Sequence, residues 1–219
     1  MAARAVCLDV MGTLFDLSAA RRRLQGLGAP AWTLEAWFGR LLHVAATVTL
    51  IGDYRPFPEL ARPALESVLA RLDLPPDGAS EVLEALAELD AYPDAAPALE
   101  RLAGADIPLV ALTNGTAQNT RALLERARLD RSVERVISTD AVGVYKPHPA
   151  VYAHAVEQLG LPARDVTLVA AHGWGVAGGR AAGLRVVWIS RLERRWPLPP
   201  PEPPAAADLI AAADRILAG

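Results

Sequence analysis

Residues 6–16, Val-Cys-Leu-Asp-Val-Met-Gly-Thr-Leu-Phe-Asp, contain the clearest structural signal in the chain. An apolar run that ends in an acid and is followed by a glycine predicts a buried parallel strand over residues 4–9, leading into a loop. Asp9 is then presented from a rigid strand end into a cleft, where a carboxylate can attack carbon or phosphorus and form an ester. The alternative for a single acid at this position is a turn-forming residue.

Strand and helix patterns alternate through the second half of the chain. The predicted strands cover residues 108–113, 135–139, 166–171 and 184–190. The predicted helices between them cover residues 116–127, residues 149–159 and a short segment that ends at Ala182. This alternation predicts an α/β fold with a Rossmann-like parallel sheet wrapped by helices. The proline-rich tract 197–204 is expected to be a stiff connector to a last helix.

The segment after the first strand has a helical pattern instead. Ser18 is expected to cap a helix that begins at Ala19, and further helical segments cover residues 33–89 without an intervening strand pattern. We therefore predict two units: a core of residues 1–16 and 91–219, and an inserted helical cap of residues 17–90.

Composition limits the classes of protein to consider. The chain has 219 residues, of which 52% are hydrophobic and 21% charged, as expected for a folded protein with room for an inserted unit. Its net charge of −3 gives no electrostatic case for a nucleic acid or an anionic membrane as partner. The single cysteine, Cys7, lies in an apolar run, which excludes an intrachain disulfide and predicts a buried thiol.

The N-terminal sequence predicts a cytoplasmic protein. Asp9 interrupts the chain before the apolar core of a signal peptide is complete. The longest apolar stretch, residues 41–52, is shorter than the ~20 residues that cross a bilayer. The exposed helices of the cap make a homodimer a reasonable assembly.

Polar side chains follow several predicted strands at the point where each strand ends. They are Asp9, Thr113, Asn114, Asp140 and His172. Because ligands of open parallel sheets bind beyond the carboxyl ends of the strands, we expect these side chains to form one site. The hydroxyl, amide and N–H groups of Thr113-Asn114-Gly115 can hold an anion. The alternative for Thr113 or Asn114 is a helix N-cap.

Residues 144–152, Val-Tyr-Lys-Pro-His-Pro-Ala-Val-Tyr, add a cation. Pro147 and Pro149 stiffen the backbone next to Lys146, which favours a positioned ammonium group. The alternative is a solvated lysine, since most lysines are exposed.

The ordered set of Asp-x-x-Gly-Thr-Leu, Thr-Asn-Gly and Lys-Pro-x-x-x-Val-Tyr, with a helical insert after the first, resembles the haloacid dehalogenase superfamily. The branch it resembles most is that of the L-2-haloacid dehalogenases, called type II, and the similarity extends over residues 6–190. The resemblance implies that Asp9 displaces halide from C2 of a short 2-haloacid. Water would then hydrolyse the ester, and no cofactor is implied.

The resemblance also implies roles for other residues. Contacts with the substrate carboxylate or with Asp9 are expected from Thr13, Thr113 and Asn114. Lys146 would stabilise the anionic nucleophile and the substrate, with Tyr152 nearby.

A phosphatase of the same superfamily is the first alternative. Such enzymes usually have a second acid two residues after the nucleophile, which protonates the leaving alkoxide. That residue is Met11 here, and halide needs no proton because it is a very weak base. The phosphatases also hold magnesium with acids near the fourth strand. Residues 170–175, Ala-Ala-His-Gly-Trp-Gly, contain no acid, so no metal is expected.

Two positions depart from the dehalogenase pattern. Gly175 stands where the resemblance predicts an acid that positions the hydrolytic water, next to Trp174. Phe38 stands where it predicts a halide-binding arginine, and Arg40 is the candidate replacement, with a solvated arginine as the alternative. His172 is a candidate water-activating base, or else a hydrogen-bonded loop histidine. With Met11, the residues Phe38, Arg40 and Trp174 complete the expected substrate pocket.

Other classes of function remain as alternatives. Gly173-Trp-Gly-Val-Ala-Gly178, followed by Glu193, matches a dinucleotide-binding pattern, but it comes late in the chain and only one further strand follows it. A binding protein that has weak or lost turnover is suggested by Gly175 and Phe38 and opposed by Asp9 and Lys146.

Overall fold

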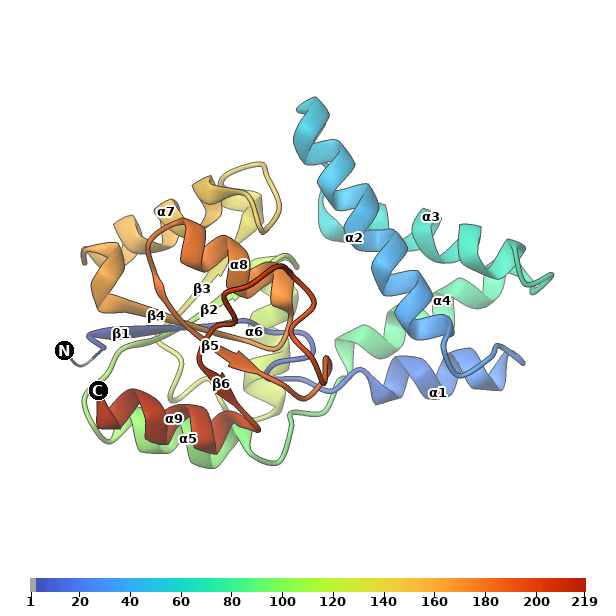
Figure 1. The fold of residues 1–219 in the computed structure, drawn as a ribbon. Coiled ribbons are helices and arrows are strands. Elements are labelled where there is room, and N and C mark those ends of the chain that lie inside the picture. The colour runs from blue at the N-terminus through green and yellow to red at the C-terminus, as the bar shows by residue number, and fades with distance from the viewer. Residues whose placement is uncertain (1–2) are drawn as a thin grey trace.

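The computed structural model describes residues 3–219. Within this range, six strands form one parallel sheet in the order β3-β2-β1-β4-β5-β6 (Figure 1). The strands are β1 (Ala5–Leu8), β2 (Leu109–Thr113), β3 (Arg135–Ser138), β4 (Val166–Ala170), β5 (Arg185–Ile189) and β6 (Ala205–Ala206). The predicted parallel α/β fold is confirmed, and all of the pairings between neighbours run parallel. The edge strand β6, which follows the proline-rich tract, was not predicted.

Strand β1 shows how the two faces of the sheet are covered. Val6 and Leu8 lie in one buried cluster with apolar side chains of α5 (Ala95–Ala103), α6 (Ala117–Arg126) and α9 (Leu209–Ala218). Cys7 points to the other face, as alternation along a strand requires, and packs in the cluster of α7 (Pro149–Leu159) and α8 (Gly173–Ala181). Figure 1 shows α7 and α8 on one side of the sheet and α5 and α9 on the other.

The Cys7 thiol is fully buried, as predicted. Burial raises its pKa to about 12, and the charge of Lys146 offsets only part of that effect. Because the thiolate is the nucleophilic form of cysteine, Cys7 is an inert core residue.

Residues 17–90, which we call the cap, contain α1 (Ser18–Gly26), α2 (Thr33–Ile51), α3 (Phe57–Ala70) and α4 (Ala79–Glu84). Figure 1 shows these helices beside the sheet, beyond the carboxyl end of β1. Helices α2 and α3 pack together, and the indole N–H of Trp37 donates to the carbonyl of Ala61 at 3.1 Å. The helical pattern expected up to residue 89 does not continue as α-helix to that residue, because α4 passes into a 3-10 turn, η2 (Ala85–Ala87).

The prediction that Ser18 caps α1 is wrong. The backbone N–H and the hydroxyl of Ser18 both donate to the Asp16 carboxylate, at 3.0 and 2.7 Å. Asp16 therefore serves as the acceptor at this helix start, a role for which aspartate is well suited.

The two chain segments that join cap and core lie side by side. The N–H of Asp16 donates to the carbonyl of Asp90 at 2.9 Å, and the N–H of Tyr92 donates to the carbonyl of Leu14 at 2.9 Å. The chain therefore enters and leaves the cap through a single hydrogen-bonded joint.

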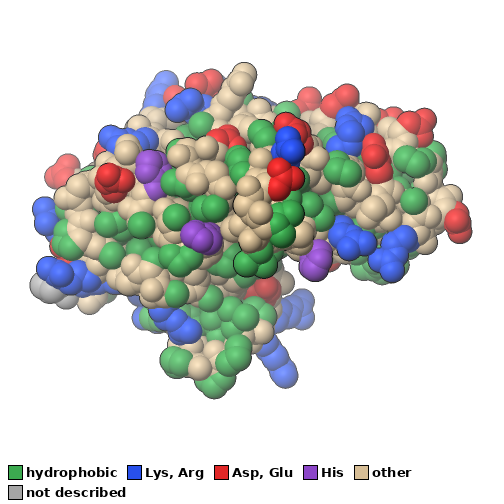
Figure 2. Space-filling model, turned by 90° about the horizontal axis from the view of Figure 1, so that it is seen from above, with side chains coloured by type: hydrophobic (Ala, Val, Ile, Leu, Met, Phe, Trp, Pro, Cys, Tyr) green, Lys and Arg blue, Asp and Glu red, His purple; other side chains and the backbone are tan. Residues whose placement is uncertain are grey.

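Helix α2 begins at Thr33, as the helical pattern over residues 33–89 predicts, and contains most of the apolar stretch 41–52. It has 19 residues with a mean hydropathy of 1.2, so by length and composition alone it is long enough to cross a membrane. Core helices of globular proteins pass the same test, and α2 packs Trp37, Leu41 and Ala45 inside the cap. Figure 2 shows acidic and basic side chains interspersed on the face seen from above.

Candidate active site

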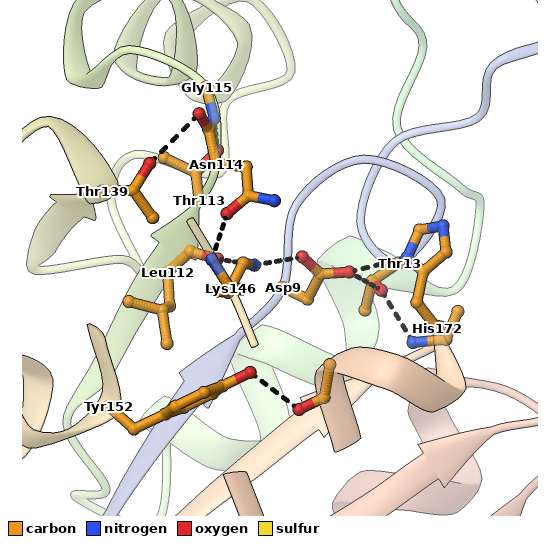
Figure 3. Close-up of polar contacts among 12 residues, drawn as sticks. Asp9, Thr13, Leu112, Thr113, Asn114, Gly115, Thr139, Lys146, Tyr152 and His172 are labelled. Atoms are coloured by element: carbon orange, nitrogen blue, oxygen red, sulfur yellow. Dashed lines mark hydrogen bonds and ion pairs between the residues drawn. The ribbon is translucent and has the colours of Figure 1, made fainter. Parts of the chain in front are cut away.

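The site lies where three neighbouring strands end. Asp9 directly follows β1, Thr113 is the last residue of β2 with Asn114 after it, and His172 follows β4 by two residues. Because β1 lies between β2 and β4 in the sheet, these side chains meet at one edge (Figure 3). Asp140, in η3 (Thr139–Ala141), is exposed and accepts a hydrogen bond from the Tyr54 hydroxyl at 2.6 Å instead. The expectation that Asp140 joins the site is wrong.

Asp9 is surrounded by donors and is almost fully buried. Its Oδ1 accepts from the Lys146 ammonium group at 2.7 Å. Its Oδ2 accepts from the Thr13 hydroxyl at 2.8 Å and lies 3.2 Å from Nδ1 of His172. Among the described residues, Oδ1 has one hydrogen-bond partner and Oδ2 has two. Oδ1 therefore keeps more lone-pair capacity for attack on a substrate.

The electrostatic environment keeps Asp9 ionised. Burial alone raises its pKa, but the charge of Lys146 and the hydrogen bonds from His172 and Lys146 outweigh that effect and hold the pKa well below its usual range. The carboxylate is therefore available as an anion at neutral pH.

Lys146 is not the solvated lysine of the alternative interpretation, since its side chain is only 2% exposed. Its Nζ also donates to the carbonyl of Leu112 at 2.7 Å, and its backbone N–H donates to Oδ1 of Asn114 at 3.0 Å. The ammonium group is thus fixed between the end of β2 and Asp9 (Figure 3).

Thr13 is held by the turn that precedes it. Gly12 has a left-handed backbone (φ +75°), and a side chain there would approach Leu192 and His172 within 3 Å. The Thr13 hydroxyl accepts from the N–H of Ala171 at 2.9 Å, so its proton is directed to Asp9.

Aromatic rings surround the His172 imidazole. Phe38 stacks on it with 5.3 Å between centroids and an interplanar angle of 22°, and the Trp174 ring lies 5.2 Å away. The ring of Trp174 also faces the Lys146 ammonium group at 5.9 Å.

A small cavity of about 20 Å³ lies over these groups. It is lined by Asp9, Met11, Phe38, Leu42, Phe57, Thr113, Asn114, Gly115, Lys146, His172 and Trp174. Leu42 and Phe57 were not predicted; both come from cap helices, where apolar spacing cannot be distinguished from core packing. The space is about that of one water molecule, so the cap lies closed over Asp9.

Three expected site residues lie outside this lining. Arg40 is exposed on α2. Tyr152 is buried below the site, where its hydroxyl donates to the carbonyl of Gly175 at 2.9 Å. The Thr13 hydroxyl donates to Oδ2 of Asp9 and does not line the cavity. The helix-cap alternative for Thr113 and Asn114 is also wrong, because Thr116 caps α6 by accepting from the N–H of Asn119.

The Gly-x-Gly-x-x-Gly pattern has a packing explanation. It forms the start of α8, and a side chain at Gly178 would lie 2.5 Å from the Tyr152 hydroxyl and 2.7 Å from Pro147. The carboxylate of Glu193 accepts from the N–H of Gly173 at 2.9 Å. Because the protein's own carboxylate occupies this helix start, the position is unsuited to a pyrophosphate.

Residues 3–219 contain no group of three or more His, Cys, Asp and Glu side chains placed to hold a metal ion. The Lys146 ammonium group stands beside Asp9, where it supplies the positive charge. The expectation of a metal-free reaction stays a prediction, tested below.

Comparison with known proteins identifies the family. The family model of haloacid dehalogenase-like hydrolases matches residues 3–183. The chain is 34% identical to (S)-2-haloacid dehalogenase 4A of Burkholderia cepacia, over 86% of this chain and 83% of that one. It superposes on the L-2-haloacid dehalogenase of Xanthobacter autotrophicus with a TM-score of 0.90 and 27% identity, covering 99% of both chains. The same enzyme with covalently bound chloropropionic acid gives a TM-score of 0.87, at 28% identity and 99% coverage of each chain.

The chain therefore belongs to the haloacid dehalogenase-like hydrolases. Within them, the predicted similarity to the L-2-haloacid dehalogenase branch is confirmed by these relatives.

Proposed function

We propose that this protein is an (S)-2-haloacid dehalogenase that acts on short 2-haloacids. Oδ1 of Asp9 attacks C2, an ester bond forms, and the halide leaves with the electron pair of the carbon–halogen bond. Water then cleaves the ester, which releases a 2-hydroxy acid and regenerates the carboxylate. The observation that carries the proposal is the buried Asp9 carboxylate, kept ionised by Lys146.

The lining of the cavity supports a division of roles. Lys146, Thr113 and Asn114 provide cationic and polar groups for the substrate carboxylate. Met11, Phe38 and Trp174 form an apolar wall around C2 and the halogen. A halide is weakly basic and leaves without a proton, so Met11 in place of a second acid is compatible with this chemistry.

The second step needs a base, and His172 is placed for it. Its Nδ1 lies 3.2 Å from Oδ2 of Asp9. In the imidazole tautomer that carries its proton on Nε2, Nδ1 has a lone pair. Once Asp9 has become a neutral ester, Nδ1 in this tautomer can accept a proton from the attacking water. This proton later passes to the product alkoxide or to solvent.

The test is a screen for halide release from chloro-, bromo- and fluoro-acids, run beside a generic phosphatase substrate. Asp9→Asn is the control, because it keeps the shape of the side chain but removes the nucleophilic charge. We expect halide release that Asp9→Asn abolishes, with circular dichroism showing a retained fold. Phosphate release, or full activity of a pure Asp9→Asn sample, would contradict the proposal.

A binding protein with weak or lost turnover is the remaining alternative, and Gly175 motivates it. Binding of 2-haloacids without halide release, even in a single turnover, would favour it.

We further infer that residues 17–90 act as one cap over a core of residues 1–16 and 91–219, in a cytoplasmic protein. We infer that neither Tyr152 nor Arg40 contacts the substrate, because the Tyr152 hydroxyl donates to the carbonyl of Gly175 and Arg40 is exposed on α2. A homodimer through the cap is the proposed assembly, since Leu50 and Ile51 at the end of α2 are exposed by 85% and 68%. Sedimentation analysis at several concentrations tests the assembly.

A further inference from the structure

A second cavity adjoins the site, and its volume is about 110 Å³. It lies between the cap and α6, and it shares Met11, Phe57 and Gly115 with the small cavity over Asp9. The two spaces therefore meet at the side chains of Met11 and Phe57.

The wall of this second cavity is largely apolar. Leu83 and Leu86 come from the end of the cap, and Leu123 comes from α6. Within the described residues, the polar side chains in the wall are uncharged; of these, Thr116 already accepts the hydrogen bond that caps α6. Such a lining favours a hydrocarbon group over a charged or strongly hydrated one.

We propose that this cavity is a subsite for an alkyl side chain on C2 of the substrate. The inference rests on the proposed dehalogenase function and extends it to a substrate class, namely straight-chain 2-haloalkanoic acids longer than propionate. The carboxylate stays with Lys146, Thr113 and Asn114, C2 stays over Asp9, and the chain passes between Met11 and Phe57.

The volume limits the length of the chain. The second cavity, at about 110 Å³, is several times larger than the small cavity of about 20 Å³, which has about the space of one water molecule, so it has room for a short alkyl chain. Methionine is flexible, so Met11 can swing aside to let the chain pass. The position at which related phosphatases carry an acid would thus control substrate length here.

The first measurement is kcat/KM for 2-chloropropionate, 2-chlorobutanoate and 2-chloropentanoate. Burial of each added methylene should raise kcat/KM about fourfold. Leu86→Trp fills the cavity from its half-buried edge. In this variant the gain per added methylene should disappear, so kcat/KM for 2-chloropentanoate should no longer exceed kcat/KM for 2-chloropropionate. Leu72→Trp, a half-buried cap residue outside both cavities, is the matched control and should keep the ratio.

Ala87→Leu, at the exposed rim of the cavity, is a second filling variant if Leu86→Trp does not fold. Calorimetry with acetate, butanoate and pentanoate supplies a readout that does not depend on turnover. Affinity should rise with chain length in the unmodified protein and not in the filling variants.

Three results would overturn the subsite: a kcat/KM that falls with length, a ratio unchanged in both filling variants, or an affinity independent of length. An equal loss for all substrates would indicate an entry path instead. Halide release from no acid at all would refute the proposed function, while the calorimetric series would still test the subsite.

Discussion

Phe38 of the cap stacks on His172 of the core, with 5.3 Å between ring centroids and an angle of 22° between the planes. This contact joins the two units directly over the nucleophile, because Nδ1 of the same imidazole lies 3.2 Å from Asp9. Phe38 therefore adds a contact from α2 to the face of the candidate base, beside the contacts that Asp9 and Trp174 make with the same imidazole.

His172→Gln should slow ester hydrolysis much more than the first attack. General-base assistance contributes ~10²–10⁴-fold, so steady-state turnover should fall by that order while one halide per enzyme is still released rapidly. Mass spectrometry should show a larger fraction of the ester on Asp9 than in the unmodified protein. Unchanged steady-state turnover in a folded variant would remove His172 from the mechanism.

Gly175→Asp should raise steady-state turnover, by up to about 10²-fold, because it supplies a water-orienting acid. A Cβ at Gly175 would lie 3.9 Å from the Cβ of Ala170, an ordinary contact, and an acid in the first turn of α8 is favoured by the helix dipole. The isosteric Gly175→Asn is the control and should give no gain. The ester on Asp9 should accumulate in the unmodified protein and decrease in Gly175→Asp.

Lys146→Met should lower kcat/KM at least about 10²-fold, because it removes the positive charge next to the Asp9 carboxylate and the substrate carboxylate. It should also change the pH profile. In the unmodified protein the pKa of Asp9 lies well below its usual range, so Asp9 is ionised throughout the mildly acidic region. Without Lys146, burial remains and raises that pKa, so residual activity should fall as the pH decreases through this region.

The exposed cation Arg40 offers a matched control for this experiment. Arg40→Ala should leave kcat/KM within about twofold, since the side chain lies on the outer side of α2. A large loss of kcat/KM in Arg40→Ala would contradict this assignment and indicate that Arg40 contributes to halide binding.

Activity should survive EDTA, because Lys146 provides the charge that a metal ion would otherwise supply. Halide release is followed before and after chelation and after addition of magnesium. Inactivation by EDTA with recovery in magnesium would support the phosphatase alternative.

The sheet and the nucleophile were predictable because they depend on short-range pattern. An apolar run that ends in an acid identifies β1 and Asp9 together, and strand alternation then brings Thr113, Asn114 and His172 to the same edge. The strand β6 was missed because its two alanines are too few to form a recognisable strand pattern.

The cap side of the site was harder to predict. Phe38 and Leu42 are four residues apart on α2 and both line the cavity, whereas Arg40 lies about 200° around the helix from Phe38. Helical periodicity could have excluded Arg40. It could not have selected Leu42 or Phe57, because apolar residues on a packed helix have the same pattern whether they contact a substrate or a core.

The paired segments Leu14–Asp16 and Asp90–Tyr92 have an evolutionary consequence. The chain leaves the core and returns to it at two neighbouring points that are joined by hydrogen bonds. The order of the strands in the sheet therefore does not depend on the length or the fold of the segment inserted between these two points. A different insert whose ends are equally close can be accommodated without moving Asp9 or Lys146. Variation in the chemical group that is recognised can thus accumulate in residues 17–90, while the reacting carboxylate is inherited unchanged.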